Sequence, residues 1–494
     1  MAKGIASKRR STVASAAATA ASTAVISIAA ALAGVLLARK LGRNAETDGF
    51  LAAYAVYLLL VLAAQAVRVV VLPQLARAAV RGALGGELRA YSTALAVVSL
   101  PALALSTFAA HDLGSLLTGG LPDTAGDAAG DALVWLVPAA VLQLYAVLGA
   151  SALAALDDYT TAALGFAAGA AISVVVFLVL ADDHGAAALA WGLAAGGVVA
   201  VAVPAVALAA HAAFSSGAAG ERPLVGRLGE LGRGAVLPLA LQGLYLVALR
   251  LAGDLGVGRI TSFSYAYFVA AFLVSATASS LALVSSVPLA RTGVRGGRAA
   301  VHVLNVSWLS LPVVAGAAGV FAVTGEAVVE LVLGSSFAGD TGAELSRLVV
   351  LLGPWMVVSV ALSVAFPLLF VERADRLLVV IAGAALAVHV PLAWALREAL
   401  GLEGLSLALA VTTSLVLAGV LAALSRETLA GVARGLLRPA MWSGALAVLA
   451  FGAAELLLDD VAAAAAGLVG YVALLTALRP GGLTEAWSYM RALA

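Results

Sequence analysis

Long runs of apolar residues, separated by short polar segments, form the dominant pattern of this sequence. A helix needs about 20 apolar residues to cross the roughly 30 Å hydrocarbon core of a bilayer. Runs of that length, bounded by charge, Gly or Pro, predict fourteen membrane-spanning helices. They cover 15–38, 49–73, 91–110, 132–156, 159–181, 186–210, 235–253, 260–288, 300–323, 346–371, 376–396, 404–424, 439–457 and 461–478. We therefore expect an all-α polytopic membrane protein without a soluble domain.

The composition agrees with this pattern. Of the 494 residues, 63% are hydrophobic and only 11% are charged, whereas soluble chains carry roughly 25% charged residues. The formal charge of +1 gives no bulk basicity for binding nucleic acid. Because the chain has no cysteine, disulfides, thiolate metal sites and cysteine nucleophiles are excluded.

Charged residues alternate between the two ends of the predicted spans. If the N-terminal segment is cytoplasmic, the inner segments hold 20 of the 28 Lys and Arg residues. The outer segments collect carboxylates, such as Asp123, Asp127 and Asp131 in one loop and Asp182 with Asp183 in another. This is the positive-inside pattern. It predicts an even number of spans with both termini in the cytoplasm.

Two distant stretches of the sequence resemble each other. Both carry an arginine, then an aromatic segment, and then a proline and Leu-Ala-Arg, with one extra residue after the proline in the first stretch. The landmarks are Arg39, Tyr54 and 73–77 in the first stretch, and Arg250, Tyr265 and 288–291 in the second. Each stretch covers a pair of predicted helices, the first and second or the seventh and eighth. Since an even number of spans separates the copies, the repeat is parallel, a layout known in transporters.

This repeat predicts two similar six-helix lobes, an N-lobe at 1–212 and a C-lobe at 235–425. Helices 13 and 14 and a cytoplasmic tail follow at 426–494. Between the lobes, the leucines at 224, 228 and 231 have helical spacing within 213–234, which predicts an amphipathic cytoplasmic linker. A plain glycine-rich loop is the alternative interpretation of this segment.

Short segments of the sequence resemble the MurJ (MviN) family, the lipid II flippases of the MOP (multidrug/oligosaccharidyl-lipid/polysaccharide) exporter superfamily. The similarity lies in the first two helices of that family and in its seventh and eighth helices. The matching segments are 38–42, 47–50, 72–75, 249–252, 265–267 and 288–291, together with Gly258. The predicted span count of fourteen also agrees with that family.

The resemblance implies a MOP-type fold, with two six-helix lobes around a V-shaped cavity and two appended helices. The implied activity is flipping of an undecaprenyl-pyrophosphate-linked peptidoglycan precursor across the bacterial cytoplasmic membrane. The implied partners are that lipid-linked precursor, membrane lipid and cell-wall synthesis proteins. Family arginines align with Ser27, Ala33 and Val61 here, whereas the family's important acidic residue is matched by Asp48.

Polar residues inside the spans are candidate substrate contacts, because a charge at membrane depth costs about 3 kcal/mol unless it faces a cavity or a partner. Arg68 follows Gln65 by one turn, and a snorkelling arginine is the alternative interpretation. Arg250 and Asp254 have i,i+4 spacing near Gln242, and a structural ion pair is the alternative. The full candidate set is Ser27, Arg39, Asp48, Tyr54, Gln65, Arg68, Gln242, Arg250, Asp254 and Tyr265.

Several functions remain open at this point. A flippase working by alternating access is the leading hypothesis, and an exporter of another polysaccharide lipid intermediate is close to it. A MATE-like cation-coupled antiporter needs a carboxylate well inside a helix, whereas nearly all carboxylates here lie in loops or at span ends. A membrane glycosyltransferase needs a catalytic outer loop, yet 110–131 lacks His-x-x-Glu and Asp-x-Asp patterns. We expect no enzyme, cofactor or metal, since phosphate-loop, nucleophile-elbow and metal-site motifs are missing.

Overall fold

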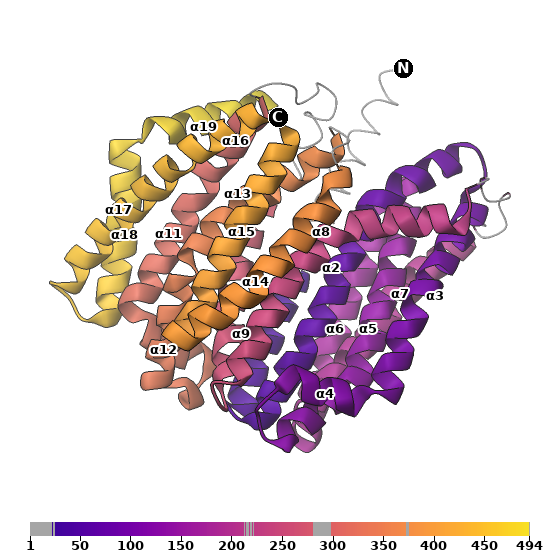
Figure 1. Cartoon of the computed structure of the whole chain (residues 1–494), viewed down its shortest axis with the longest axis horizontal. Helices are drawn as coiled ribbons and strands as arrows, with labels where there is room; N and C mark the ends of the chain where they lie inside the picture. The colour runs from indigo at the N-terminus through magenta and orange to yellow at the C-terminus, as the bar shows by residue number, and fades with distance from the viewer. Residues whose placement is uncertain are drawn as a thin grey trace. The chain divides into compact units, whose positions relative to one another are not determined.

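The structure, a computed structural model, describes residues 22, 25–211, 213, 217, 220, 222–279, 298–371 and 375–493. The regular elements of this part of the chain are helical (Figure 1). A helix over 25–41 comes first. It is followed by α2 (Ala45–Val80), α3 (Leu84–Phe108), α4 (Ala110–Thr118), α5 (Asp123–Ala155), α6 (Tyr159–His184), α7 (Ala187–Ala210), α8 (Leu224–Gly253), α9 (Arg259–Val274), α11 (Arg298–Leu333), α12 (Asp340–Leu351), α13 (Gly353–Val371), α14 (Leu378–Leu400), α15 (Leu402–Leu424), α16 (Arg426–Gly435), α17 (Leu437–Glu455), α18 (Asp460–Leu478) and α19 (Gly481–Leu493).

Within the described residues, 12 helices are long and apolar enough to cross a membrane, or 13 if the bent pair α12–α13 is one span. These correspond to the second to fourteenth predicted spans, so the all-α polytopic class is confirmed. The first predicted span, 15–38, is only partly described, by the helix over 25–41. The proline segment of the second repeat copy, 288–291, lies outside the described residues.

One predicted span, 346–371, is divided into α12 and α13, which differ in direction by 43°. The break falls at Leu352, and Gly353 and Pro354 are the first residues of α13. A proline has no N–H to donate and its ring crowds the carbonyl group four residues earlier, so it favours a break or the first turn of a new helix. Residues 340–351 therefore form a helix of their own.

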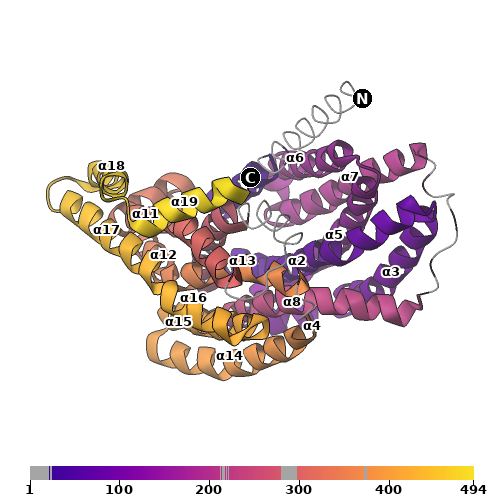
Figure 2. The ribbon, with the colours of Figure 1, turned by 90° about the horizontal axis from the view of Figure 1, so that it is seen from above.

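The chain divides into two compact units, Met1–Leu246 and Val247–Ala494. In the first unit, α2 and α7 pack along α5, and α6 pairs with α7 (Figure 1 and Figure 2). The core of this unit includes Tyr91 and Leu95 of α3, Leu148 and Leu153 of α5, and Leu231 of α8. Apolar contacts with α3 and α5 thus hold the start of α8 in this unit.

In the second unit, α15 packs against both α14 and α13, and the long helix α11 contacts α12, α13, α17 and α18. The pair α17–α18 forms a small core around Phe451 and Tyr471. The Tyr471 hydroxyl donates a hydrogen bond to the carbonyl oxygen of Pro312 at 2.9 Å. This bond attaches the last two apolar helices to α11, beside which they lie in Figure 1.

The predicted linker helix and the predicted seventh span are joined in the structure as one helix, α8. Three glycines at 226, 229 and 232 weaken helix propensity there, and Pro238 lies further along the same helix. The helix nevertheless starts at Leu224, because Leu231 is buried in the core of the first unit and Arg227 pairs with a carboxylate of α3. Tertiary contacts outweigh local propensity in this segment.

The crossing of α6 and α7 is a contact between backbones. A Cβ atom on Gly169 would lie 2.5 Å from the carbonyl oxygen of Gly196, and a Cβ on Gly196 would lie 2.4 Å from that of Gly169. Small residues that allow such close approach are typical of helix pairs in membranes.

Replacing Gly196 with Ala is expected to destabilise the protein by about 1 to 3 kcal/mol, the usual cost of an overpacked core. Thermal stability of the detergent-purified protein measures this effect. The control is Gly383→Ala, because a Cβ at this position of α14 meets no heavy atom within 4 Å. Equal stability of the two variants would show that the α6–α7 contact is looser than described.

Candidate functional site

The predicted site residues near the start of α2 lie in a buried region. Asp48 is in the first turn of α2, where the helix dipole favours a carboxylate, and its side chain is 0% exposed. Asn44 caps the helix, since its Oδ1 accepts a hydrogen bond from the Thr47 N–H at 2.9 Å. Asp48 is followed by Gly49, and a Cβ atom added to Gly49 would lie 2.1 Å from the carbonyl oxygen of Ala125. The start of α2 is thus pressed against α5, with Asp48 inside the unit.

Tyr54 belongs to an aromatic stack along α2. Its ring centroid lies 6.1 Å from that of Phe50 and 5.4 Å from that of Tyr57. Tyr57 is buried and Tyr54 is half-buried. The stack therefore gives this face of α2 an apolar surface carrying phenol hydroxyls.

The other candidates of the first unit are spread apart. Ser27 is half-buried and Arg39 exposed on the helix over 25–41, and Arg68 is exposed on α2. The side chain of Gln65 lies outside the described residues. Asp48 and Arg68 are twenty residues apart on one helix, which separates them by about 30 Å. The first unit therefore does not bring its predicted candidates into a single site.

In the second unit, Arg250 and Asp254 form an ion pair with a third residue. The Arg250 Nη1 atom lies 2.7 Å from Asp254 Oδ1. Arg397, near the end of α14, donates to the other oxygen of Asp254 and also to Glu398. The Arg397 side chain is only 12% exposed. Asp254 thus connects the C-terminal ends of α8 and α14, and positive side chains suit those ends because of the helix dipole.

Gln242 and Tyr265 are buried. The side-chain nitrogen of Gln242 has no hydrogen-bond partner among the described residues, and the residue is 3% exposed. Tyr265 packs edge-to-face on Phe337, with ring centroids 5.5 Å apart, and also contacts Phe268. Tyr265 is therefore enclosed by aromatic rings of its own unit.

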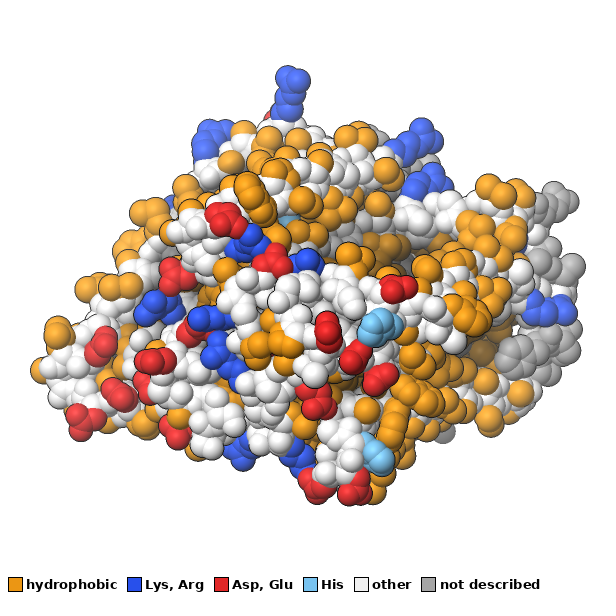
Figure 3. Space-filling model, turned by 60° about the horizontal axis from the view of Figure 1, so that its bottom comes forward, with side chains coloured by type: hydrophobic (Ala, Val, Ile, Leu, Met, Phe, Trp, Pro, Cys, Tyr) orange, Lys and Arg blue, Asp and Glu red, His pale blue; other side chains and the backbone are white. Residues whose placement is uncertain are grey.

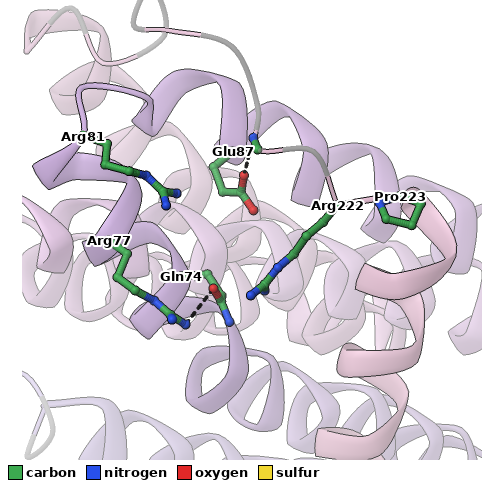
Figure 4. A pocket seen from close by; sticks show the side chains of 7 residues that line it. Gln74, Arg77, Arg81, Glu87, Arg222 and Pro223 are labelled. Carbon is green, nitrogen blue, oxygen red and sulfur yellow. Dashed lines mark hydrogen bonds between the residues drawn. The ribbon is translucent and has the colours of Figure 1, made fainter.

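A pocket of about 380 Å³ lies in the first unit, at the turn between α2 and α3. None of its arginines is among the site residues predicted from the sequence. The i,i+4 spacing of Arg77 and Arg81 at the end of a span was the signal that could have found them. The lining residues, most of them labelled in Figure 4, are Gln74, Arg77, Arg81, Glu87, Gly220, Arg222 and Pro223.

Glu87, one of the lining residues, belongs to a buried ion pair. Arg227 Nη2 lies 3.1 Å from Glu87 Oε2, and the two side chains are 5% and 6% exposed. Glu87 also accepts a hydrogen bond from the Gly220 N–H at 3.1 Å. The Arg227 guanidinium lies 5.7 Å from the centroid of the Tyr91 ring. The ion pair thus ties the start of α8 and the segment before it to α3.

Carboxylates gather elsewhere on the first unit. Asp112 of α4 and Asp123, Asp127 and Asp131 of α5 are exposed. Figure 3 shows the molecule from the side on which α4 lies, and acidic side chains stand out on this face. His111 Nδ1 lies 3.0 Å from Asp127 Oδ1. Among the described residues, no group of three or more His, Asp or Glu side chains is arranged to hold a metal ion.

The fold is similar to that of solved transporters of the MOP superfamily. Among solved structures, the lipid II flippase MurJ in its inward closed conformation matches with a TM-score of 0.72 and 12% sequence identity, over 93% of this chain and 98% of that chain. The predicted MOP-type fold and the similarity to MurJ are thereby confirmed at the level of the fold.

Two other matches belong to the same superfamily. An inward-facing multidrug resistance MATE transporter matches with a TM-score of 0.61 and 16% identity, over 84% of this chain and 95% of that chain. A MOP transporter from Pyrococcus furiosus, described as having a binding pocket of reverse polarity, matches with a TM-score of 0.54 and 13% identity, over 85% and 93%. No family model matches the sequence, and no curated protein matches it.

Proposed function

We propose that this multi-pass membrane protein is a flippase that moves a lipid-linked cell-wall precursor across the cytoplasmic membrane of a bacterium by alternating access. The proposed cargo is lipid II-like, with an undecaprenyl-pyrophosphate anchor. The observation that carries the proposal is the fold match to the lipid II flippase MurJ over 93% of this chain. Two-lobed transporters of this kind move a cargo by rocking one half against the other.

Because one fold can serve different cargoes, the charges of the chain have to match the charge of the cargo. A pyrophosphate group that leaves water needs compensating cations. Ser27 stands where the MurJ family has an arginine, so other cations must compensate the charge of the pyrophosphate. The exposed Arg68 and the 36% exposed side chain of Arg250 are the proposed ones. An anion at Arg250 has to compete with Asp254, which is shared with Arg397.

The proposed orientation has both termini in the cytoplasm. The exposed carboxylates near α4 then belong to the outer face, and the basic pocket at the α2–α3 turn belongs to the cytoplasmic side. This arrangement follows the positive-inside rule. The division of the chain into an N-lobe, a linker and a C-lobe, with partners in cell-wall synthesis, is part of the same proposal.

A MATE-like cation-coupled antiporter is the second candidate. Two observations favour it: the fold match to a MATE transporter with a TM-score of 0.61, and the fully buried Asp48. A buried carboxylate can bind and release a proton or Na⁺ during transport. An exporter of another polysaccharide lipid intermediate would use the same fold and the same cations as the flippase.

Replacement of an essential lipid II flippase in bacterial cells is the direct test. Cells depleted of their own flippase are expected to survive when this chain is expressed, and precursor labelled on the outer leaflet is expected to return to its normal level. If a folded, membrane-inserted protein fails to restore the label, the proposed cargo is wrong. Ion-gradient-driven efflux of small molecules that is lost in Asp48→Asn would instead support the antiporter.

A further inference from the structure

The pocket at the α2–α3 turn is lined by three arginines from two directions. Arg77 and Arg81 come from the end of α2, and Arg222 comes from the segment that leads into α8. Figure 4 shows the side chains of Arg81 and Arg222 extending from opposite sides toward the same space. Gln74 lies beside them and accepts a hydrogen bond from Arg77 Nη2 at 2.8 Å.

The positive charge of the pocket is not fully balanced by the described carboxylates. Glu87, the acidic residue of the lining, is already engaged by the buried Arg227. Arg222 contacts Glu230 at 3.2 Å, although its side chain is 45% exposed. The guanidinium group of Arg81 has no hydrogen-bond or ion-pair partner within the part of the chain that the structure describes. The pocket therefore has an excess of donors for an anion.

We propose that this pocket binds a phosphate group, carried by the headgroup of an anionic lipid or by a soluble phosphate compound. Guanidinium groups offer paired N–H donors whose geometry matches the oxygens of phosphate. The volume of about 380 Å³ is enough for a phosphate with a small substituent. The pocket also follows directly on the apolar run 49–73 of α2, the level at which lipid headgroups begin.

A bound phosphate would connect two parts of the first unit. It would contact α2 through Arg77 and Arg81, and the segment that leads into α8 through Arg222. The Glu87–Arg227 pair already joins the beginning of α8 to α3. The phosphate thus adds a link between the end of α2 and the beginning of α8. This inference concerns a site apart from Arg68 and Arg250 and does not depend on the transported cargo.

The test uses the purified full-length chain in detergent, with three probes: dioleoyl phosphatidylglycerol, dioleoyl phosphatidylcholine and inorganic phosphate. Native mass spectrometry measures lipid binding, and titration calorimetry measures inorganic phosphate binding. The variant Arg77→Gln/Arg81→Gln is expected to bind phosphatidylglycerol or inorganic phosphate, whichever the unchanged chain binds, at least tenfold more weakly than that chain does. Arg222→Gln is expected to weaken binding in the same direction.

The matched control is Arg426→Gln/Arg434→Gln, because both arginines are exposed on α16. This helix belongs to the second unit, whereas the pocket residues belong to the first. This control is expected to bind within twofold of the unchanged chain. Loss of lipid binding in the pocket variants identifies a headgroup site, and loss of inorganic phosphate binding identifies a site for soluble phosphate. If the folded pocket variants bind every probe as well as the control does, the proposal is overturned.

Discussion

Replacement of Arg227 by Met is expected to lower the free energy of unfolding by about 3 to 5 kcal/mol, the usual cost of removing one partner from a buried ion pair. The Glu87 side chain, 6% exposed, would keep its charge with only the Gly220 N–H as a described donor. Burial of an uncompensated carboxylate is far less favourable than burial of a neutral group of the same size. The thermal midpoint of the detergent-purified protein reports this loss.

Two further variants make the result specific to the ion pair. The double variant Glu87→Gln/Arg227→Met removes both charges and keeps an oxygen for the Gly220 N–H, so it is expected to be more stable than Arg227→Met alone. Arg222→Met removes a more exposed partner of Glu230 and is expected to cost about 1 kcal/mol or less. If Arg227→Met is no less stable than Arg222→Met, the pair is not buried as described.

Replacement of Arg250 and Arg68 by Ala is expected to lower the rate of precursor flipping at least tenfold. The expectation rests on the proposed function, because a pyrophosphate without compensating cations cannot enter a low-dielectric region. Arg250→Ala should leave the fold intact, since Asp254 keeps Arg397 as a partner. Arg68 is exposed, so its removal leaves no buried group unpaired. The measurement is leaflet labelling of the precursor in cells that depend on this chain.

The control for this experiment is Arg347→Ala. Arg347 pairs with Glu403 on the surface, and its side chain is 68% exposed. Flipping by this variant is expected to equal that of the unchanged chain at the same membrane level. Normal flipping by the Arg68→Ala/Arg250→Ala double variant would exclude these residues as the charge-compensating set and favour a less charged cargo.

The spans were predictable because bilayer thickness imposes a length on each apolar run. The short helices were not, since α4, α16 and α19 have only 9, 10 and 13 residues and mix apolar with polar positions. The joined helix α8 was missed for a different reason. Its glycines argue for a loop, whereas its stability comes from contacts with α3 that local sequence does not reveal.

The candidate site was predictable only where partners are close in sequence. Arg250 and Asp254 are four residues apart, and the predicted pair forms. Arg397 lies 143 residues from Asp254, and Arg227 lies 140 residues from Glu87. No periodicity links residues at such distances, so a single sequence cannot show that these charges meet. The basic pocket was missed for the same reason, because Arg222 reaches it from a distant segment.

The long separation of Glu87 and Arg227 also affects how the protein is made. Four helices, α4 to α7, are synthesised between them. At 5–20 residues per second, the ribosome needs roughly 7 to 28 s to cover this interval. During this time the Glu87 carboxylate lacks the arginine with which it pairs in the folded protein. The contact that joins α3 to the beginning of α8 can therefore form only after Arg227 has been synthesised, and a chain truncated before Arg227 would lack the partner of Glu87.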